Sequence, residues 1–107
     1  MQINQMTPVE LKQELENQTP LFLLDVREPI EFRYAKIEGS VLIPLNQLSE
    51  RLDELDKAQH VVVICHHGMR SLQAANYLVH YGFEQVSNLI GGVDAWSLQC
   101  DNQVPRY

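Results

Sequence analysis

Apolar residues follow two different patterns along the chain. In some places they form short uninterrupted runs, and in others they recur every three or four positions. Uninterrupted runs of strand length are typical of strands that are buried on both faces of a parallel sheet. They predict strands at 21–24, 41–43 and 61–64, with a weaker candidate at 85–89 and a short edge strand at 2–3.

Helix signals lie between these runs. Thr7 and Glu10 have the spacing of a capping box, and Pro8 stands at the first helical position, where a missing N–H is tolerated. Asn46 is the candidate cap of a second helix, and Gly82 stands where a glycine would end a third. The helices expected after the first are at 48–55, 72–79 and 93–98.

Strands that alternate with helices predict an α/β fold, in which a mostly parallel sheet is covered by helices on both faces. With 107 residues the chain has the length of one domain, 1–107. Ligands of such sheets bind beyond the carboxyl ends of the strands. Asp25 and Cys65 each come directly after a predicted strand, so we expect the functional site at that edge.

Charge and composition restrict the classes of partner. The formal net charge of −6 argues against nucleic acid and against anionic membranes, which attract basic proteins. The net charge does not exclude a small anionic substrate, because such a substrate needs only a local positive potential at its binding site. The N-terminus lacks a secretory signal, no apolar stretch is long enough to span a membrane, and two cysteines are too few for a disulfide scaffold. We therefore expect a cytoplasmic, monomeric protein with free thiols.

The segment Cys65-His66-His67-Gly68-Met69-Arg70-Ser71 joins a predicted buried strand to an amphipathic helix. In such a loop the backbone N–H groups curl inward at a helix start, where the partial charge is positive. That field and the Arg70 guanidinium favour the thiolate form of Cys65, and Gly68 permits the tight turn. The pattern indicates a nucleophilic cysteine that handles an anion. A buried, unreactive thiol is the alternative interpretation of a lone cysteine.

Here the chain resembles the rhodanese family, and in particular its single-domain thiosulfate sulfurtransferases. The segment 65–70 matches the family's active loop, C-x-x-G-x-R. Further matches lie at 25–32, 82–83 and 89–96, and 35–40 resembles the family's G-H-I-x-G-A with Ala35 and Lys36 in place of glycine and histidine. The resemblance covers nearly the whole chain and implies a five-stranded parallel sheet flanked by helices.

The resemblance also implies a double displacement that needs no metal and no organic cofactor. The Cys65 thiolate takes the outer sulfur of thiosulfate or of a persulfide donor, and the persulfide passes it to cyanide, a thiol or a protein. Amides from His66 to Ser71 would stabilise the persulfide, and Arg70 would hold the anionic donor. Many relatives have a basic residue beside the cysteine, whereas imidazoles are fully charged only below about pH 6.5. His66 and His67 therefore predict weak thiosulfate binding at neutral pH and tighter binding in mild acid.

Two further charged residues and the second cysteine lie outside the loop. Asp25 and Arg27 are candidates for supporting the loop, with a turn residue and a surface ion pair as the equally weighted alternative. Cys100 could form a disulfide with Cys65 or accept its sulfur, but a free surface thiol is the favoured interpretation.

Two other functions stay open. Relatives of this fold hydrolyse phosphate esters or reduce arsenate, but their loop is one residue longer, with arginine six positions after the cysteine. Here position 71 is serine, and the shorter loop suits one added sulfur better than a phosphoryl group. A non-catalytic or regulatory rhodanese-like module is the other alternative, although Cys65 and Arg70 are both present. The physiological donor, acceptor and pathway are not encoded in any motif.

Overall fold

The computed structural model describes residues 3–107 and shows, within them, a five-stranded sheet in which all neighbouring strands are parallel. The strand order is β1-β5-β4-β2-β3, so β4 is central. The strands are β1 (Asn4–Met6), β2 (Phe22–Asp25), β3 (Val41–Leu42), β4 (His60–Ile64) and β5 (Gln85–Leu89). This confirms the α/β fold and the parallel sheet. The edge strand expected at 2–3 begins instead at Asn4, and residue 2 lies outside the described residues.

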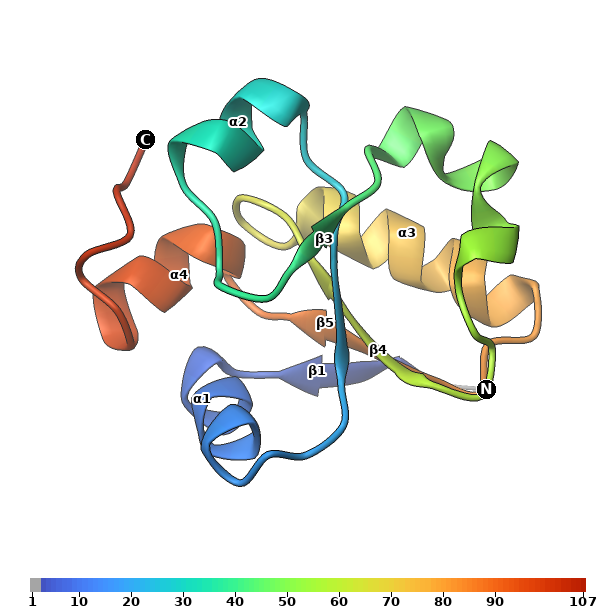
Figure 1. Cartoon of the computed structure of the whole chain (residues 1–107), viewed down its shortest axis with the longest axis horizontal. Coiled ribbons are helices and arrows are strands. Elements are labelled where there is room, and N and C mark those ends of the chain that lie inside the picture. Colours follow the sequence, from blue (N-terminus) through green and yellow to red (C-terminus); the bar gives the residue numbers. More distant parts are fainter. Residues whose placement is uncertain (1–2) are drawn as a thin grey trace.

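Helices cover both faces of the sheet (Figure 1). One face packs against α1 (Pro8–Glu16) and α4 (Gly92–Gln99), and the other against α3 (Met69–His80). A fourth helix, α2 (Pro29–Tyr34), follows the carboxyl end of β2. None of the helices within residues 3–107 combines the length and the apolar character that crossing a membrane requires.

The side chains of β4 show how both faces of the sheet become core. Val61 and Val63 point to the face covered by α3, whereas Val62 and Ile64 point to the face covered by α1 and α4. All four are at most 1% exposed. A central strand whose side chains enter a core on each face of the sheet thus requires an uninterrupted apolar run.

The segment 48–55 is not the α-helix that its leucine spacing predicts. It contains two short 3-10 helices, η1 (Leu45–Glu50) and η2 (Leu52–Glu54), and Pro44 rather than Asn46 precedes the first. Leucines stand three residues apart at 45 and 48 and again at 52 and 55, which is the repeat of a 3-10 helix. Arg51 lies between the two turns with φ −121°, outside the helical region, and separates them.

The helix α2 has no apolar periodicity to predict it, because none of its residues is buried. Its signal lies at its start: Pro29 takes the first helical position, and Glu31 accepts the Glu28 N–H at 2.9 Å. The same arrangement begins α1, where both capping-box hydrogen bonds join Thr7 and Glu10 as expected.

Candidate active site

Cys65 is the first residue after the central strand β4. The chain turns through His66 and His67 to Gly68, which caps α3 with φ 105°. A Cβ on Gly68 would lie 3.3 Å from the Gly91 backbone nitrogen, so both conformation and close packing favour glycine there. We call residues 65–71 the cysteine loop. Met69, within it, exposes its side chain to solvent.

The Cys65 sulfur is enclosed by its own loop. The residue is 1% exposed, which is less than is usual for a reactive thiol and less than the loop pattern predicts. Its surroundings nevertheless differ from those of an inert core thiol. Sγ accepts the Gly68 N–H at 3.0 Å, the thiol donates to Ser71 Oγ at 3.2 Å, and the Ser71 hydroxyl donates to Oδ1 of Asn88. The sulfur therefore faces polar groups on the loop side.

The cysteine loop turns its first carbonyl groups toward α4. The Val93 N–H donates to the Cys65 carbonyl at 2.8 Å, and the Asp94 N–H donates to the His66 carbonyl at 3.1 Å. Apart from Gly68, the loop residues after Cys65 have amides that make no hydrogen bond within residues 3–107. Unpaired N–H groups at the start of a helix form an array that attracts anions.

Gly92 allows α4 to approach the loop this closely. Its φ is 59°, and a Cβ there would collide with the carbonyl oxygens of Cys65 and His66 and lie 2.6 Å from the His66 carbonyl carbon. We expect Gly92→Ala to lower the free energy of unfolding by about 3 kcal/mol, through overpacking and backbone strain together. Urea denaturation of the variant measures this loss.

Gly39 provides the matched control. It has a similar left-handed backbone, with φ 87°, but an added Cβ would meet no atom within 4 Å. Gly39→Ala should therefore cost only the conformational strain, about 1 kcal/mol. Equal losses for the two variants would show that the contact with the cysteine loop is unimportant.

Arg70 is paired with Glu31 of α2. Two guanidinium N–H groups donate to the carboxylate oxygens at 2.6 and 2.8 Å. Glu31 also accepts the Glu28 N–H at 2.9 Å and the Tyr107 hydroxyl at 3.0 Å. The hydrogen bonds from Arg70 are the main reason that the pKa of Glu31 falls to about 2, although burial opposes the shift. The pKa of Arg70 rises, chiefly through its hydrogen bonds to Glu31, although burial opposes the shift.

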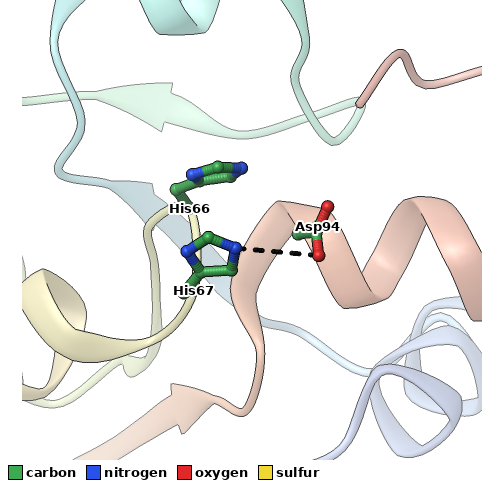
Figure 2. A group of neighbouring side chains, drawn as sticks. All are labelled: His66, His67 and Asp94. Atoms are coloured by element: carbon green, nitrogen blue, oxygen red, sulfur yellow. Dashed lines mark ion pairs between the residues drawn. The ribbon is translucent and has the colours of Figure 1, made fainter. Parts of the chain in front are cut away.

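The two loop histidines lie beside Tyr107 and Asp94. The His66 ring stacks on the Tyr107 ring with centroids 3.9 Å apart and planes at 10°, and it also lies 3.9 Å from the His67 ring. Burial is the main reason that the pKa of His66 is lowered, which disfavours the charged imidazolium. His67 is mostly exposed, with Nε2 3.7 Å from Oδ2 of Asp94 (Figure 2).

The ligand atoms of His66, His67 and Asp94 lie within 4.8 Å of one another. The two imidazole rings lie against each other at a tilt of 34°, however, and His66 is stacked on Tyr107, whereas the ligands of one metal ion have to converge on it. Asp94 is also bound by Arg106, with Nε 2.8 Å from Oδ1. The contacts within the group are therefore ring packing between the two histidines and the ion pair of His67 with Asp94 (Figure 2).

Asp25 and Arg27 form an ion pair at the carboxyl end of β2, where Asp25 is in register with Ile64, the residue before Cys65. Both side chains are 0% exposed, and Arg27 donates to the carboxylate from Nε at 2.9 Å and from Nη2 at 2.7 Å. The alternative of a surface ion pair is therefore wrong: β2 carries Asp25 into the interior, and the two charges compensate each other there. Arg27 also donates to the Ala35 carbonyl and, at 2.7 Å, to the hydroxyl of Tyr107, the ring of which packs on His66.

Cys100 lies on the other face of the sheet. Cys65 packs in the core under α3, whereas Cys100 packs against the core under α1 and α4. Both are free thiols. Cys100 is half-buried rather than on the surface, and this burial raises the pKa of its thiol. The sheet separates the two sulfur atoms.

Glu31, Asn88 and Tyr107 complete the site, and the loop motif does not indicate them. Asn88 donates to the Gly68 carbonyl at 3.4 Å and accepts from Ser71. The one feature that could have indicated Asn88 is its position near the end of β5, the strand that pairs with β4. Tyr107 has no such signal, because it reaches the loop from the far end of the sequence.

Comparisons with known proteins agree with this site. The family model described as rhodanese-like domain matches residues 7–99. A putative sulfurtransferase YtwF of Bacillus subtilis is 38% identical over 90% of this chain and 92% of that protein. The thiosulfate sulfurtransferase GlpE of Pseudoalteromonas translucida is 32% identical over 87% of this chain and 89% of that protein.

Solved structures and longer relatives show the same domain. The rhodanese-like domain protein of Staphylococcus aureus has a TM-score of 0.85 at 28% identity, with 98% of this chain and 99% of that one covered. The chain spans 33% of the rhodanese-like/PpiC domain-containing protein 12 of Arabidopsis thaliana, at 37% identity. The relatives that match over most of their length are named sulfurtransferases, which supports sulfur transfer as the general chemistry. Together with the parallel sheet and the cysteine loop after its central strand, these matches show that the chain belongs to the rhodanese-like domain family.

Proposed function

We propose that the chain is a sulfurtransferase that carries a sulfane sulfur as a persulfide on Cys65. The donor is thiosulfate or a persulfide, and the acceptor is a thiophile such as cyanide or a thiol. The observation that carries the proposal is the polar enclosure of Sγ, which accepts the Gly68 N–H at 3.0 Å within a loop of otherwise unpaired amides. The names of the GlpE and YtwF relatives support the same chemistry.

The loading step is a displacement at sulfur. The Cys65 thiolate attacks the outer sulfur of thiosulfate and forms a new S–S bond. The bond between the outer and inner sulfur atoms breaks, and its electron pair leaves with sulfite. The product is a Cys65 persulfide with one negative charge on its terminal sulfur, and sulfite carries away two. The total charge is therefore the same before and after the step.

The cysteine loop stabilises both anionic forms of Cys65. The Gly68 N–H already donates to Sγ, and the unpaired amides of the loop remain available to the added sulfur when the negative charge moves there. Ser71 donates to Asn88 in the thiol form, and its hydroxyl can rotate to donate to the sulfur once the thiol proton is lost. The loop thereby offers hydrogen-bond donors to the sulfur in the thiolate and in the persulfide.

The discharge step returns the enzyme to its first state. Cyanide attacks the terminal sulfur, the S–S bond breaks, and thiocyanate leaves while the electron pair stays on Cys65. A thiol of a small molecule or of a partner protein can attack in the same way. No cofactor takes part, and a reducing compartment such as the cytoplasm would keep Cys65 reduced between turnovers. We expect a monomer to suffice, because the loop and its supports come from one chain.

The paired state of Arg70 argues against the phosphatase alternative. A phosphoryl group is bound by a guanidinium that is free to make two hydrogen bonds to it. Here those positions are taken by Glu31 at 2.6 and 2.8 Å. A persulfide adds only one sulfur atom to Cys65, and this sulfur does not need two hydrogen bonds from a guanidinium.

Intact-mass measurement tests the proposal directly. The reduced protein, incubated with thiosulfate and freed of excess donor, should gain the mass of one sulfur atom. Cyanide should remove that mass and release an equal amount of thiocyanate. A protein that gains no sulfur from thiosulfate or from an organic persulfide, or gains it without losing it to cyanide, would contradict the proposal.

A further inference from the structure

We propose that the preferred sulfur donor carries a single negative charge and an organic, mostly apolar body, and that Glu31 is the residue that discriminates against the dianion thiosulfate. This inference rests on the proposed function, because it concerns the donor that loads Cys65. Two independent features support it: the pairing of every arginine around the cysteine loop, and a groove beside Arg70.

Three arginines lie around the loop, and each is paired with a carboxylate. Arg27 is bound to Asp25, Arg70 to Glu31, and Arg106 to Asp94. The pairs contribute no net charge, and the whole chain carries −6. A dianion that approaches Cys65 therefore meets no uncompensated guanidinium among these three and is repelled by the protein at longer range.

Glu31 is held in place more firmly than an ordinary surface carboxylate. Both oxygens are saturated: one accepts from Arg70 and from the Glu28 N–H, and the other accepts from Arg70 and from Tyr107. An anionic donor can bind the Arg70 guanidinium only if it displaces the Glu31 carboxylate or shares the guanidinium with it. Either route costs more for two negative charges than for one.

A groove of about 700 Å³ lies between η1 and α3 and has Arg70 in its wall. This is the size of a pocket for a small organic molecule. Its apolar lining consists of Val26, Leu45, Leu48 and Tyr77. Besides Arg70, the polar side chains in it are one carboxylate, one imidazole, three amides and a hydroxyl: Glu28, His80, Asn46, Gln73, Asn76 and Ser49. Arg70 is the residue that the groove shares with the cysteine loop, so in the proposed complex the sulfur of the donor lies in the loop and its body in the groove.

Thiosulfonates are sulfur donors with which the effect of the donor's charge can be measured separately from the effect of its size. Methanethiosulfonate has one charge where thiosulfate has two and is equally small, and benzenethiosulfonate adds an apolar ring at the same charge. In each, the Cys65 thiolate forms a bond to the terminal sulfur, the S–S bond of the donor breaks, and the electron pair leaves on a sulfinate. The persulfide product and the cyanide assay are the same for all three donors.

The expected order of kcat/KM in the unaltered protein is benzenethiosulfonate, then methanethiosulfonate, then thiosulfate. Glu31→Gln removes the charge and should raise the ratio of kcat/KM for thiosulfate to that for methanethiosulfonate about tenfold, the effect of one unit charge at a partly exposed site. Ser49→Trp fills the groove and should lower the ratio for benzenethiosulfonate to methanethiosulfonate about tenfold. Glu31→Asp, which retains the charge, should retain the donor order.

Glu38→Gln is the matched control, because it removes an exposed carboxylate for which the described residues show no hydrogen bond. It should leave both ratios within twofold, about the scatter of such a comparison. Thiosulfate preferred in the unaltered protein, or ratios that do not move in Glu31→Gln and Ser49→Trp, would overturn the inference. If a variant does not fold, the donor order of the unaltered protein decides. Failure of all three donors to load Cys65, seen by intact mass, would instead contradict the proposed function.

Discussion

Replacing Cys65 by alanine is expected to abolish sulfur loading and to lower thiocyanate formation at least about a thousandfold, because the attacking atom is then absent. The residue lies at the end of the central strand, and alanine is smaller, so the fold should persist. Intact mass after thiosulfate treatment and a thiocyanate assay measure the two effects, and circular dichroism confirms that the variant is folded.

Cys100→Ala is the matched control, because it removes the other free thiol from the opposite face of the sheet. It should load one sulfur and turn over at the rate of the unaltered protein. A sulfur that remains bound in Cys65→Ala and disappears in Cys100→Ala would reassign the carrier residue and refute the proposed function.

Replacing Asp25 by asparagine is expected to lower the free energy of unfolding by about 3–5 kcal/mol, the cost of leaving a buried charge without its partner. The amide has nearly the shape of the carboxylate, so cavity formation does not contribute. Arg27 would keep its buried charge, with only one oxygen facing its Nε and Nη2 donors in place of two. Urea denaturation gives the loss. Sulfur transfer should fall as well, because Arg27 holds the Tyr107 hydroxyl.

Two comparisons show whether burial is the cause. Glu54→Gln breaks the exposed pair between Arg51 and Glu54, of the same chemistry, and should change stability little. Asp25→Ala combined with Arg27→Met removes both buried charges and should be less damaging than Asp25→Asn alone. If Asp25→Asn costs no more than Glu54→Gln, the buried pair does not stabilise the fold.

Features that depend on neighbours in the sequence were predictable from it. Continuous apolar runs indicated the neighbouring strands β4, β2 and β3, and for β4 and β2 the reason is that a strand buried on both faces has no polar side. The signal was weaker for β5, although that strand also lies inside the sheet. The start of α1 was predictable because the partners of its capping box, Thr7 and Glu10, are three residues apart. Likewise, the cysteine loop is one contiguous segment, so its turn at Gly68 could be expected.

Features that depend on distant partners were not predictable. The loop motif predicted that the Arg70 guanidinium would be free to bind an anionic substrate. Instead it is bound to the carboxylate of Glu31, which lies 39 residues away in the sequence. Tyr107 meets Arg27 across 80 residues, and no local pattern encodes such a contact. Leucines at 48, 52 and 55 fit an α-helix and a pair of 3-10 turns almost equally well, and the packing of the chain decided between them.

In the proposed carrier, the placement of the two cysteines on opposite faces of the sheet determines how the persulfide can be discharged. An enzyme with a second thiol near the first can resolve its own intermediate by forming an internal disulfide. Here the sheet blocks that route, so the sulfur leaves only when a nucleophile from another molecule arrives. Under the proposed function, the lifetime of the persulfide is therefore set by the concentration of the sulfur acceptor, so one molecule can hold a sulfur atom until an acceptor arrives.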